Sequence, residues 1–381
     1  NVGSNVISVE KNETKQVNAS LDNKFNLITD KVDSDNMTFM SLDTDIATVD
    51  KYTGKVTAKK EGKAYITLKS VSGEDEAVVK VNVIGEDKKT AEKVVVGNIH
   101  SLALKQDGTI WAWGDNSNGE IGNGVANSAY ITEPTQVEKG EYTEVIQSTS
   151  PDGSVVTTTT KAQKTLDDIK DIAAGYYYNL ALDAEGNVWA WGYNGYGNLG
   201  LGDTNTRTLP VKVQALEKIT KIEASNVSSF AIDSNNKLWV AGYNGYGNLG
   251  DGTTSNRATF TQNPILDEVA DVSASPVNST IALLLDGTVW GFGNNTYNAL
   301  TNVGGAVPQQ LTSEEGSLSN ITAINEGYYS GYAITSEEKV VTWGLNNYAQ
   351  LATGDKTTKT LATYMKDKEG QDFTDVMIVS G

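Results

Sequence analysis

Tyrosine recurs at regular intervals along the C-terminal half of the chain. Four tyrosines are separated by 50, 51 and 51 residues, and two others stand three residues before the first pair. A tyrosine ring offers rigid apolar area and a hydroxyl group, which surfaces that bind proteins or sugars use. We expect these side chains to form a ring on one face, with packing inside the loops as the alternative. The residues are Tyr196, Tyr246, Tyr297 and Tyr348, together with Tyr193 and Tyr243.

Groups that could catalyse a reaction or hold a metal are few. His100 is the only histidine and the chain has no cysteine, which excludes a histidine-rich metal site, a two-histidine mechanism and thiolate chemistry. The many carboxylates include no pair that spacing marks as a glycosidase pair. His100 precedes a strand-like run at 101–104, where we expect it to make a structural hydrogen bond. We predict no catalytic residue, no cofactor and no metal site.

The charge balance argues against nucleic acid as a partner. The chain has 30 Lys and Arg residues against 48 Asp and Glu residues, a formal net charge of -18. Binding to phosphates requires clustered cations, and no basic tail supplies them. Whether the acidic surface binds calcium stays open. No apolar run approaches the roughly 18 residues of a membrane-spanning helix, so we expect no span in this chain.

The elements that must position these tyrosines come from an internal repeat. The segments 189–200 and 239–250 share nine consecutive residues, from Gly192 and from Gly242 onward. The residue before this glycine recurs at intervals of 78, 50, 51 and 51 residues. A period near 50 residues built from short strands indicates a ring of β-sheets. Five such units are present, marked by Trp113, Trp191, Ala241, Phe292 and Trp343.

Each unit reads as four short strands. In the second unit the strand-like runs are 171–175, 179–182, 188–191 and 211–213, with a turn at 184–187. Asp107-Gly108 and Asp286-Gly287 occupy the turn in other units, where an Asp-Gly pair suits a two-residue hairpin turn with positive φ. Because blades stack on both faces, we expect four tryptophans to fill the gaps between them. They are Trp111, Trp189, Trp239 and Trp290.

These units resemble the repeat of the regulator of chromosome condensation family. The resemblance is carried by the runs 172–175, 180–182, 188–192 and 198–204, and it covers Lys93 to the C-terminus. It implies a β-propeller, which in this family has about seven blades. The runs 298–301 and 349–352 depart from the Asn-Leu-Gly pattern, which puts their loop geometry in doubt. Residues Val376 to Gly381 repeat the first strand of a sixth unit, so either that strand closes a five-bladed ring or further blades follow.

The first 84 residues differ in kind. They lack the Trp-Gly signature and contain alternating strands such as 64–68 and 77–81, which favour a small β-sandwich. The run from Asp45 to Thr67 is similar to the bacterial group 2 Ig-like domain. We therefore predict an all-β chain with a sandwich at 1–84, a linker at 85–92 and propeller repeats of four-stranded blades at 93–381.

The long first interval contains about 28 surplus residues, which lie within about 125–168. Two strand-like runs, 142–147 and 155–160, flank Ser-Pro-Asp-Gly, so the surplus is expected to form a projecting β-hairpin. An exposed strand edge can pair with another chain. We predict that the hairpin either makes an intermolecular contact or shields a blade edge. The candidate contact residues are Tyr142, Val145 and Val156.

The architecture favours a noncatalytic binding or adhesion module at the bacterial cell surface or in the extracellular space. The Ig-like domain would act as a spacer that presents the propeller to a protein or glycan partner. Self-assembly through the hairpin and the terminal strand is a variant of this hypothesis. The alternatives are a secreted hydrolase with carboxylates in the central funnel and an inhibitor resembling the propeller-type β-lactamase inhibitors.

Overall fold

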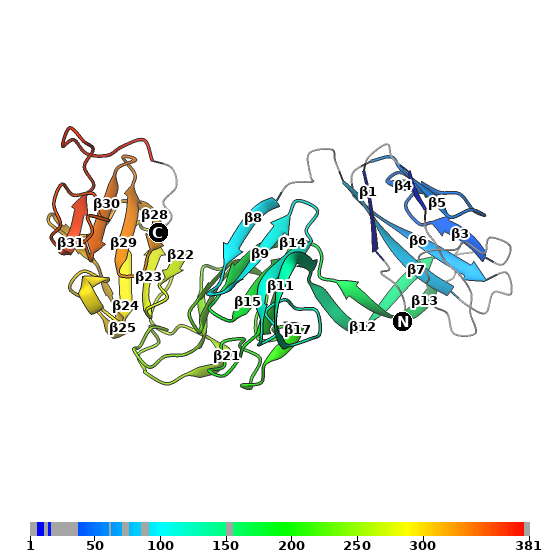
Figure 1. Cartoon of the computed structure of the whole chain (residues 1–381), viewed down its shortest axis with the longest axis horizontal. Coiled ribbons are helices and arrows are strands. Elements are labelled where there is room, and N and C mark those ends of the chain that lie inside the picture. The colour runs from blue at the N-terminus through cyan, green and yellow to red at the C-terminus, as the bar shows by residue number, and fades with distance from the viewer. Residues whose placement is uncertain are drawn as a thin grey trace.

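The computed structural model describes residues 6–10, 14–16, 37–60, 62–70, 76–84, 91–149 and 155–376. Within these residues the chain is built from β-strands and one short 3₁₀ segment, η1 (Thr296–Asn298). Figure 1 shows a small N-terminal domain beside a curved array of sheets. The described residues contain no helix with the length and apolar character needed to cross a membrane. The predicted all-β fold class is confirmed.

The N-terminal domain is a sandwich of two sheets, in the orders β1-β7-β6-β3 and β2-β5-β4. Alternating apolar residues of both sheets, among them Phe39, Val56, Ile66 and Val81, are buried between them. Gly54 turns the chain between β4 and β5 at φ 67°. The strands are β1 (Val6–Glu10), β2 (Thr14–Gln16), β3 (Met37–Ser41), β4 (Ala47–Val49), β5 (Lys55–Ala58), β6 (Gly62–Ser70) and β7 (Glu76–Ile84).

Five four-stranded antiparallel blades follow. The first strand of each blade after the first contacts the first two strands of the preceding blade, and the first strands lie along the inner edge of the array. The strands are β8 (Ala91–Val96), β9 (His100–Lys105), β10 (Ile110–Asn116) and β11 (Asn127–Gln136) in blade 1; β14 (Ile169–Ala174), β15 (Tyr178–Asp183), β16 (Val188–Gly192) and β17 (Arg207–Lys212) in blade 2; β18 (Ile219–Ser225), β19 (Ser228–Asp233), β20 (Leu238–Gly242) and β21 (Arg257–Gln262) in blade 3; β22 (Val269–Ala274), β23 (Ser279–Leu284), β24 (Val289–Gly293) and β25 (Gly305–Gln310) in blade 4; and β28 (Ile321–Glu326), β29 (Ser330–Thr335), β30 (Val340–Gly344) and β31 (Lys359–Tyr364) in blade 5.

Two short elements and one hairpin lie between blades. β26 (Thr312–Ser313) and β27 (Gly316–Ser317) extend the sheet of blade 5. β12 (Glu138–Thr149) and β13 (Val155–Thr165) pair antiparallel as a separate two-stranded sheet. The surplus residues of the first repeat interval, expected within about 125–168, begin later than position 125, because β11 pairs with β10 and completes blade 1.

Hydrophobic clusters lie between successive blades. Leu102 and Ala112 of blade 1 pack with Ile172 and Trp191 of blade 2, and comparable clusters join each later pair. A sheet that is covered on both faces must be apolar on both, which is why the central strand β15 is buried along its whole length. This packing holds the loops of adjacent blades at fixed distances from one another.

The tryptophan prediction was only partly right. Trp111, Trp189, Trp239 and Trp290 are half-buried, and their indole N–H groups bond to residues of the preceding hairpin turn, such as Asp183 and Thr109. Trp191 and Trp343 are the fully buried ones. Their Nε1 atoms donate to the main-chain oxygens of Glu120 (2.9 Å) and Ala299 (2.7 Å) in the preceding blade's loop. The position directly before the repeated glycine lies two residues after the position of the half-buried tryptophans. Its side chain therefore faces the centre of the gap between two blades.

The Asp-Gly turns also differ from the prediction. Only the glycine has a positive φ, 78° at Gly108 and 79° at Gly287. Gly108 N–H donates to the Lys105 carbonyl, and Asp107 Oδ1 accepts from the Thr109 N–H at 3.0 Å. The aspartate thus stabilises the turn through its side chain, because its carboxylate accepts a hydrogen bond from a main-chain N–H that the type I turn itself does not pair.

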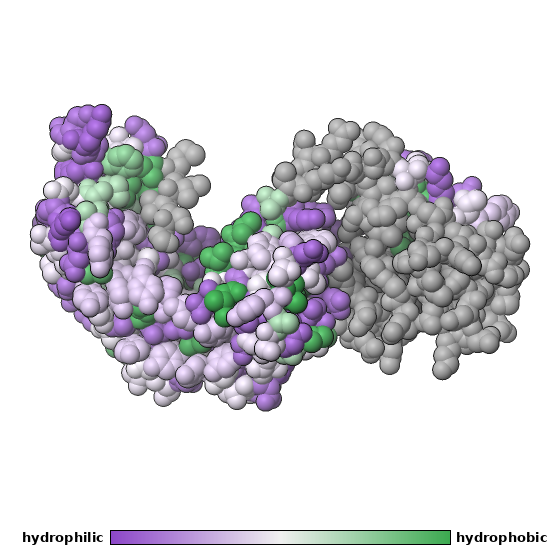
Figure 2. All heavy atoms as spheres, viewed as in Figure 1, coloured by the Kyte–Doolittle hydropathy of each residue, from purple (hydrophilic) through white to green (hydrophobic). Residues whose placement is uncertain are grey.

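The described residues define some of the other boundaries that the sequence predicts. β8 begins at Ala91, two residues before the expected start of the repeats, and residues 85–90 of the expected linker lie outside the described residues. The expected strand Val376–Gly381 also lies outside them, except for its first residue. Figure 2 shows hydrophobic surface on blade 1 beside the hollow of the array. The exposed apolar residues of that blade include Val94 and Val96 of β8.

Candidate binding pocket

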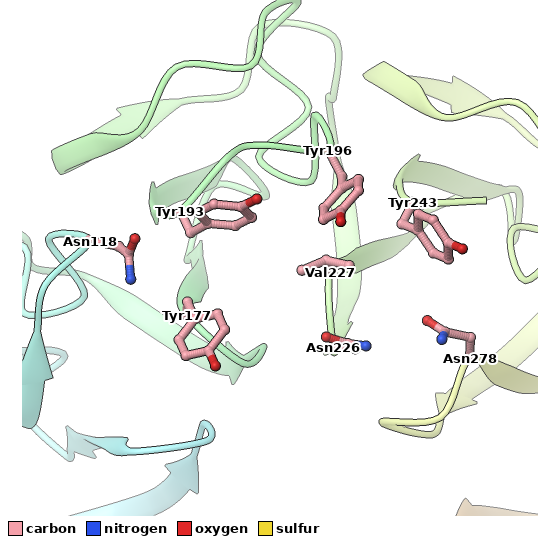
Figure 3. A pocket seen from close by; sticks show the side chains of 8 residues that line it. All are labelled: Asn118, Tyr177, Tyr193, Tyr196, Asn226, Val227, Tyr243 and Asn278. Carbon is pink, nitrogen blue, oxygen red and sulfur yellow. The ribbon is translucent and has the colours of Figure 1, made fainter. Parts of the chain in front are cut away.

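A pocket of about 500 Å³ lies among the loops of blades 1 to 4. The loops between the first and second strands of blades 2 to 4 form one side, and the loops after the third strands of blades 1 to 3 form the other (Figure 3). Its lining contains no carboxylate, no amine and no guanidinium group. The lining residues are Tyr177, Asn226, Val227 and Asn278 on the first side and Asn118, Tyr193, Tyr196 and Tyr243 on the second.

The tyrosines form a continuous edge-to-face array across blades 2 and 3. The ring centroids are 6.3 Å apart for Tyr177 and Tyr193, 6.2 Å for Tyr193 and Tyr196, and 5.2 Å for Tyr196 and Tyr243. Tyr243 continues to Tyr246 at 6.2 Å. Edge-to-face pairs of this kind add about 0.5–1.5 kcal/mol each beyond burial, so the contacts between the rings stabilise the array.

A buried asparagine holds each loop that carries these tyrosines. Asn194 Oδ1 accepts from Leu199 N–H at 2.9 Å, and its Nδ2 donates to the Asp203 carbonyl at 2.9 Å. The same oxygen accepts from the residue five positions on in all five blades. Sequence reasoning missed this group, although an asparagine two residues after the repeated glycine is the signal. The residues are Asn116, Asn194, Asn244, Asn295 and Asn346.

Glycine places the two inner tyrosines of the second side. A Cβ atom at Gly195 would come within 2.1 Å of the Tyr193 hydroxyl, and one at Gly245 within 2.2 Å of the Tyr243 hydroxyl. Each ring therefore lies over its own loop, which only glycine permits. Burial raises the pKa of both phenols, so both hydroxyls are neutral hydrogen-bond donors at pH 7.

Amide side chains complete the pocket. Asn278 Oδ1 is buried and has no hydrogen-bond partner among the described residues. Asn118 Nδ2 donates to Glu120 Oε1 at 2.8 Å, which fixes the amide at the pocket edge. The amides were not singled out from the sequence, because they occupy positions that carry other residue types in other blades.

The remaining predicted tyrosines lie outside the pocket. Tyr246 is 50% exposed at the end of the array, and Tyr297 contacts Tyr329 at 4.9 Å in a separate cluster. Tyr348 is 86% exposed and has no ring contact within the described part of the chain. The structure therefore brings together Tyr193, Tyr196 and Tyr243.

The three hairpin candidates are separate from this pocket. Tyr142 and Val145 lie on β12, and Val156 lies on β13. The contact role expected of these three side chains stays a prediction.

His100 has the structural position that the sequence predicts. It is 3% exposed, and its Nε2 lies 2.7 Å from Asn179 Oδ1 of the next blade. Burial lowers its pKa, which keeps the imidazole neutral. Tyr178 holds the same position in blade 2, and its hydroxyl donates to the Ser228 carbonyl of blade 3 at 2.6 Å. Both residues join adjacent blades.

Two carboxylates on the inner strands are paired with cations. Lys93 lies 2.6 Å from Asp171, and Lys221 lies 3.1 Å from Asp271, each pair joining two blades. Burial raises the pKa of Glu223 to about 8, with nearby Lys93 opposing the shift. Among the described residues no three acidic or histidine side chains are grouped to hold a metal ion.

Comparisons with family models agree with both predicted resemblances. Residues 185–232 match a model of the regulator of chromosome condensation (RCC1) repeat, and residues 91–120 and 169–198 match a second model of that repeat. Residues 2–81 match the group 2 bacterial Ig-like domain.

Curated relatives match about a third of this chain. Ultraviolet-B receptor UVR8 of Arabidopsis thaliana is 28% identical over 122 residues, 32% of this chain and 22% of that protein. Probable E3 ubiquitin-protein ligase HERC6 of Homo sapiens is 33% identical over 129 residues, 33% of this chain and 10% of that protein. The match thus spans less than a quarter of the length of either relative.

A solved structure supports the fold. The structure of human WBSCR16 has a TM-score of 0.57 and 15% sequence identity, and the likeness covers 88% of this chain and 95% of that chain. At this identity the likeness concerns the fold alone. The family matches and the observed sheets together show that the chain joins a group 2 bacterial Ig-like domain to a β-propeller array of RCC1 repeats.

Proposed function

We propose that this protein is a noncatalytic binding module of the bacterial cell surface or extracellular space. The Ig-like domain acts as a spacer, and the tyrosine array presents a recognition face to a protein or glycan partner. The observation that carries the proposal is the continuous array from Tyr177 to Tyr246 beside a pocket without charged groups.

Physical reasons support recognition at this face. Tyrosine is enriched among the residues that dominate binding energy, because it buries large area at a small cost in side-chain entropy. The array is exposed where a ligand would need it: Tyr196 and Tyr246 are 40% and 50% exposed. The loops are held by buried asparagines, so little ordering is required on binding.

The companion domain and the composition support the proposed compartment. A bacterial Ig-like domain precedes the repeats. The absence of cysteine from the sequence fits a protein that folds outside the cell without disulfides. Homo-assembly through the β12–β13 hairpin is part of this proposal.

The test uses the full chain labelled with a fluorophore and intact bacterial cells of several cell-wall types, with binding measured by flow cytometry. The double variant Tyr196→Ala and Tyr243→Ala should reduce binding at least tenfold. Tyr348→Ala, a change at the corresponding loop position of blade 5, should leave it unchanged. Equal binding by the double variant and the unaltered protein would refute the role of this face, provided that circular dichroism shows both to be folded.

The hydrolase alternative has one observation in its favour. The inner strands place Glu223 near Asp171 and Asp271, and a carboxyl with a pKa of about 8 is protonated at neutral pH, as a general acid must be. Hydrolysis of nitrophenyl glycosides that disappears in Glu223→Gln would favour this alternative. We expect no such hydrolysis, because Lys93 and Lys221 neutralise the two neighbouring aspartates.

A further inference from the structure

We infer that the tyrosine pocket binds a neutral carbohydrate, with the sugar held between its two rows of side chains. This inference rests on the proposed function and names the class of ligand. It is carried by three features of the pocket: the spacing of aromatic rings, the amide side chains and the absence of charge from the lining.

The two rows face each other across the pocket. Figure 3 shows Tyr193, Tyr196 and Tyr243 along one side and Tyr177, Asn226 and Asn278 along the other, with Val227 between them. The pocket's volume of about 500 Å³ lies within the range of small-ligand sites. Sugar rings have C–H faces that pack on aromatic rings and hydroxyl edges that reach polar groups. A ligand with two such surfaces matches the two rows.

The amides supply both hydrogen-bond donors and acceptors. A buried acceptor without a partner, such as Asn278 Oδ1, costs about 1–3 kcal/mol unless a ligand or water satisfies it. Each amide side chain offers one acceptor and two donor hydrogens, and each sugar hydroxyl can both donate and accept. Amides therefore suit a polyhydroxylated ligand better than one that only accepts.

The lining also excludes other ligand classes. A phosphate or carboxylate ligand needs a cation, and the lining contains no lysine, arginine or histidine. Tyrosine stacking could hold a nucleobase, but the backbone of a nucleic acid requires cations as well, and the chain's net charge is -18. The phenols of Tyr193 and Tyr243 are neutral at pH 7, since the ordinary pKa of tyrosine is about 10 and burial raises theirs further.

The backbone dictates which substitutions can test the amides. Asn278 has φ 66°, a conformation that glycine adopts without strain, so Asn278→Gly removes the amide and keeps the loop. Asn226→Ala removes the second amide. Tyr196→Phe removes only a hydroxyl, whereas Tyr196→Ala removes the ring. Tyr348→Ala is the control outside the pocket.

The experiment is isothermal titration calorimetry of the full chain with four tetrasaccharides: cellotetraose, maltotetraose, the tetramer of N-acetylglucosamine, and tetragalacturonate as the anionic control. We expect at least one neutral tetrasaccharide to bind and tetragalacturonate not to bind. Asn226→Ala with Asn278→Gly, and Tyr196→Ala alone, should each weaken binding at least tenfold. Tyr196→Phe and Tyr348→Ala should change it less than threefold.

The outcomes separate this inference from the proposed function. If the Tyr196→Ala and Tyr243→Ala double variant loses cell binding but no neutral tetrasaccharide binds, the carbohydrate inference is overturned and the binding face stands. Binding of tetragalacturonate equal to that of the neutral sugars would also overturn it. If neither cells nor tetrasaccharides bind through this face, both conclusions fall.

Discussion

One asparagine in each repeat, buried in four of the five blades, holds the loop that follows the third strand. The Gly-rich loop turns too sharply for its main-chain N–H and C=O groups to pair with one another as in a β-sheet. The asparagine side chain forms hydrogen bonds with these groups instead. Asn194 makes two such bonds at 2.9 Å, and Asn346 makes corresponding bonds in blade 5. The tyrosines of the pocket stand on either side of Asn194 in the chain.

Asn194→Ala should destabilise the protein by about 2–4 kcal/mol, because it leaves a buried N–H and a buried carbonyl without partners. Asn346→Ala should cost a similar amount, since Asn346 is equally buried. Only Asn194→Ala should also weaken ligand binding. Urea unfolding measures the first effect and calorimetry the second. Equal effects of the two variants on binding would show that the loop of blade 2 does not position the site.

Glu326 is a buried acid whose ionisation opposes folding. It is 6% exposed, neither carboxyl oxygen has a hydrogen-bond partner among the described residues, and burial raises its pKa well above the ordinary value, with the nearby Ser279 hydroxyl opposing the shift. A raised folded-state pKa means that stability is fully present below the unfolded pKa, near 4.5, and is lost as pH rises above it. The loss has a limiting slope of about 1.4 kcal/mol per pH unit.

Glu326→Gln keeps the shape of the side chain and removes the titration. The variant should match the unaltered protein at pH 4 and exceed it in melting temperature at pH 8, with the difference growing between these values. Thermal unfolding followed by circular dichroism at several pH values measures it. A difference that does not depend on pH would show that the carboxyl is not buried in solution.

At the scale of the element, the repeat predicts where the loop glycines stand. It does not predict how the loop is shaped where another residue replaces a glycine. Units 4 and 5 have other residues at the positions that Gly197 and Gly200 occupy in unit 2, and the sequence does not predict the shape of these two loops. In the structure Asn298, Thr301, Ala349 and Ala352 all keep the positive φ of the glycines that they replace. The loop shape is imposed by the buried asparagine and by the blade rather than by local preference.

Gly200 and Ala352 hold the same loop position and give a matched pair of tests. Gly200 has φ 67°, and a Cβ atom there would come within 2.2 Å of the buried ring of Phe260 in blade 3. Gly200→Ala should therefore cost about 3 kcal/mol or more through strain and overpacking. Ala352, at φ 49°, already carries the strain.

Ala352→Gly should stabilise the protein by about 1 kcal/mol, because the left-handed conformation costs an alanine more than a glycine. Midpoints of guanidinium unfolding compare the two variants. A loss of stability in Ala352→Gly would show that the entropy of the unfolded chain outweighs the backbone strain at this position.

The periodic features of the chain could be predicted, and the features that depend on contacts between blades could not. The 50-residue period established the blade order, the turn at 184–187 and the tyrosine positions. It could not show that Trp191 rather than Trp189 fills the gap, because both lie on one strand and the choice depends on the neighbouring loop. The pocket amides were likewise hidden, since Asn118, Asn226 and Asn278 come from three different blades.

At the scale of the whole molecule, the hairpin β12–β13 lies between the two domains. β12 runs beside β17, the outer strand of blade 2, and β13 approaches β7 of the Ig-like domain (Figure 1). Lys63 of β6 also forms an ion pair with Asp168 at the entry to blade 2. An exposed ion pair contributes only about 0–1 kcal/mol. We therefore expect the hairpin, more than the ion pair, to hold the spacer against the propeller.

Shortening the hairpin tests this expectation. Glu141 pairs with Gln163, so deleting residues 142–160 and replacing Lys161-Ala162 with Asn-Gly leaves a two-residue turn that suits a short hairpin. The domains should then reorient freely, which broadens the distribution of distances in small-angle X-ray scattering. Lys63→Met, which removes the ion pair and keeps the hairpin, is the control and should leave the scattering profile unchanged.

The same deletion distinguishes the two roles expected of the hairpin. If the hairpin only shields the edge of blade 2 and supports the spacer, the deletion changes the scattering profile and leaves the molar mass from light scattering unchanged. If the hairpin pairs with a second copy, the unaltered protein is an oligomer and the deletion variant is a monomer, because an exposed strand edge offers its N–H and C=O groups to another strand. A deletion variant with the scattering profile and molar mass of the unaltered protein would contradict both roles.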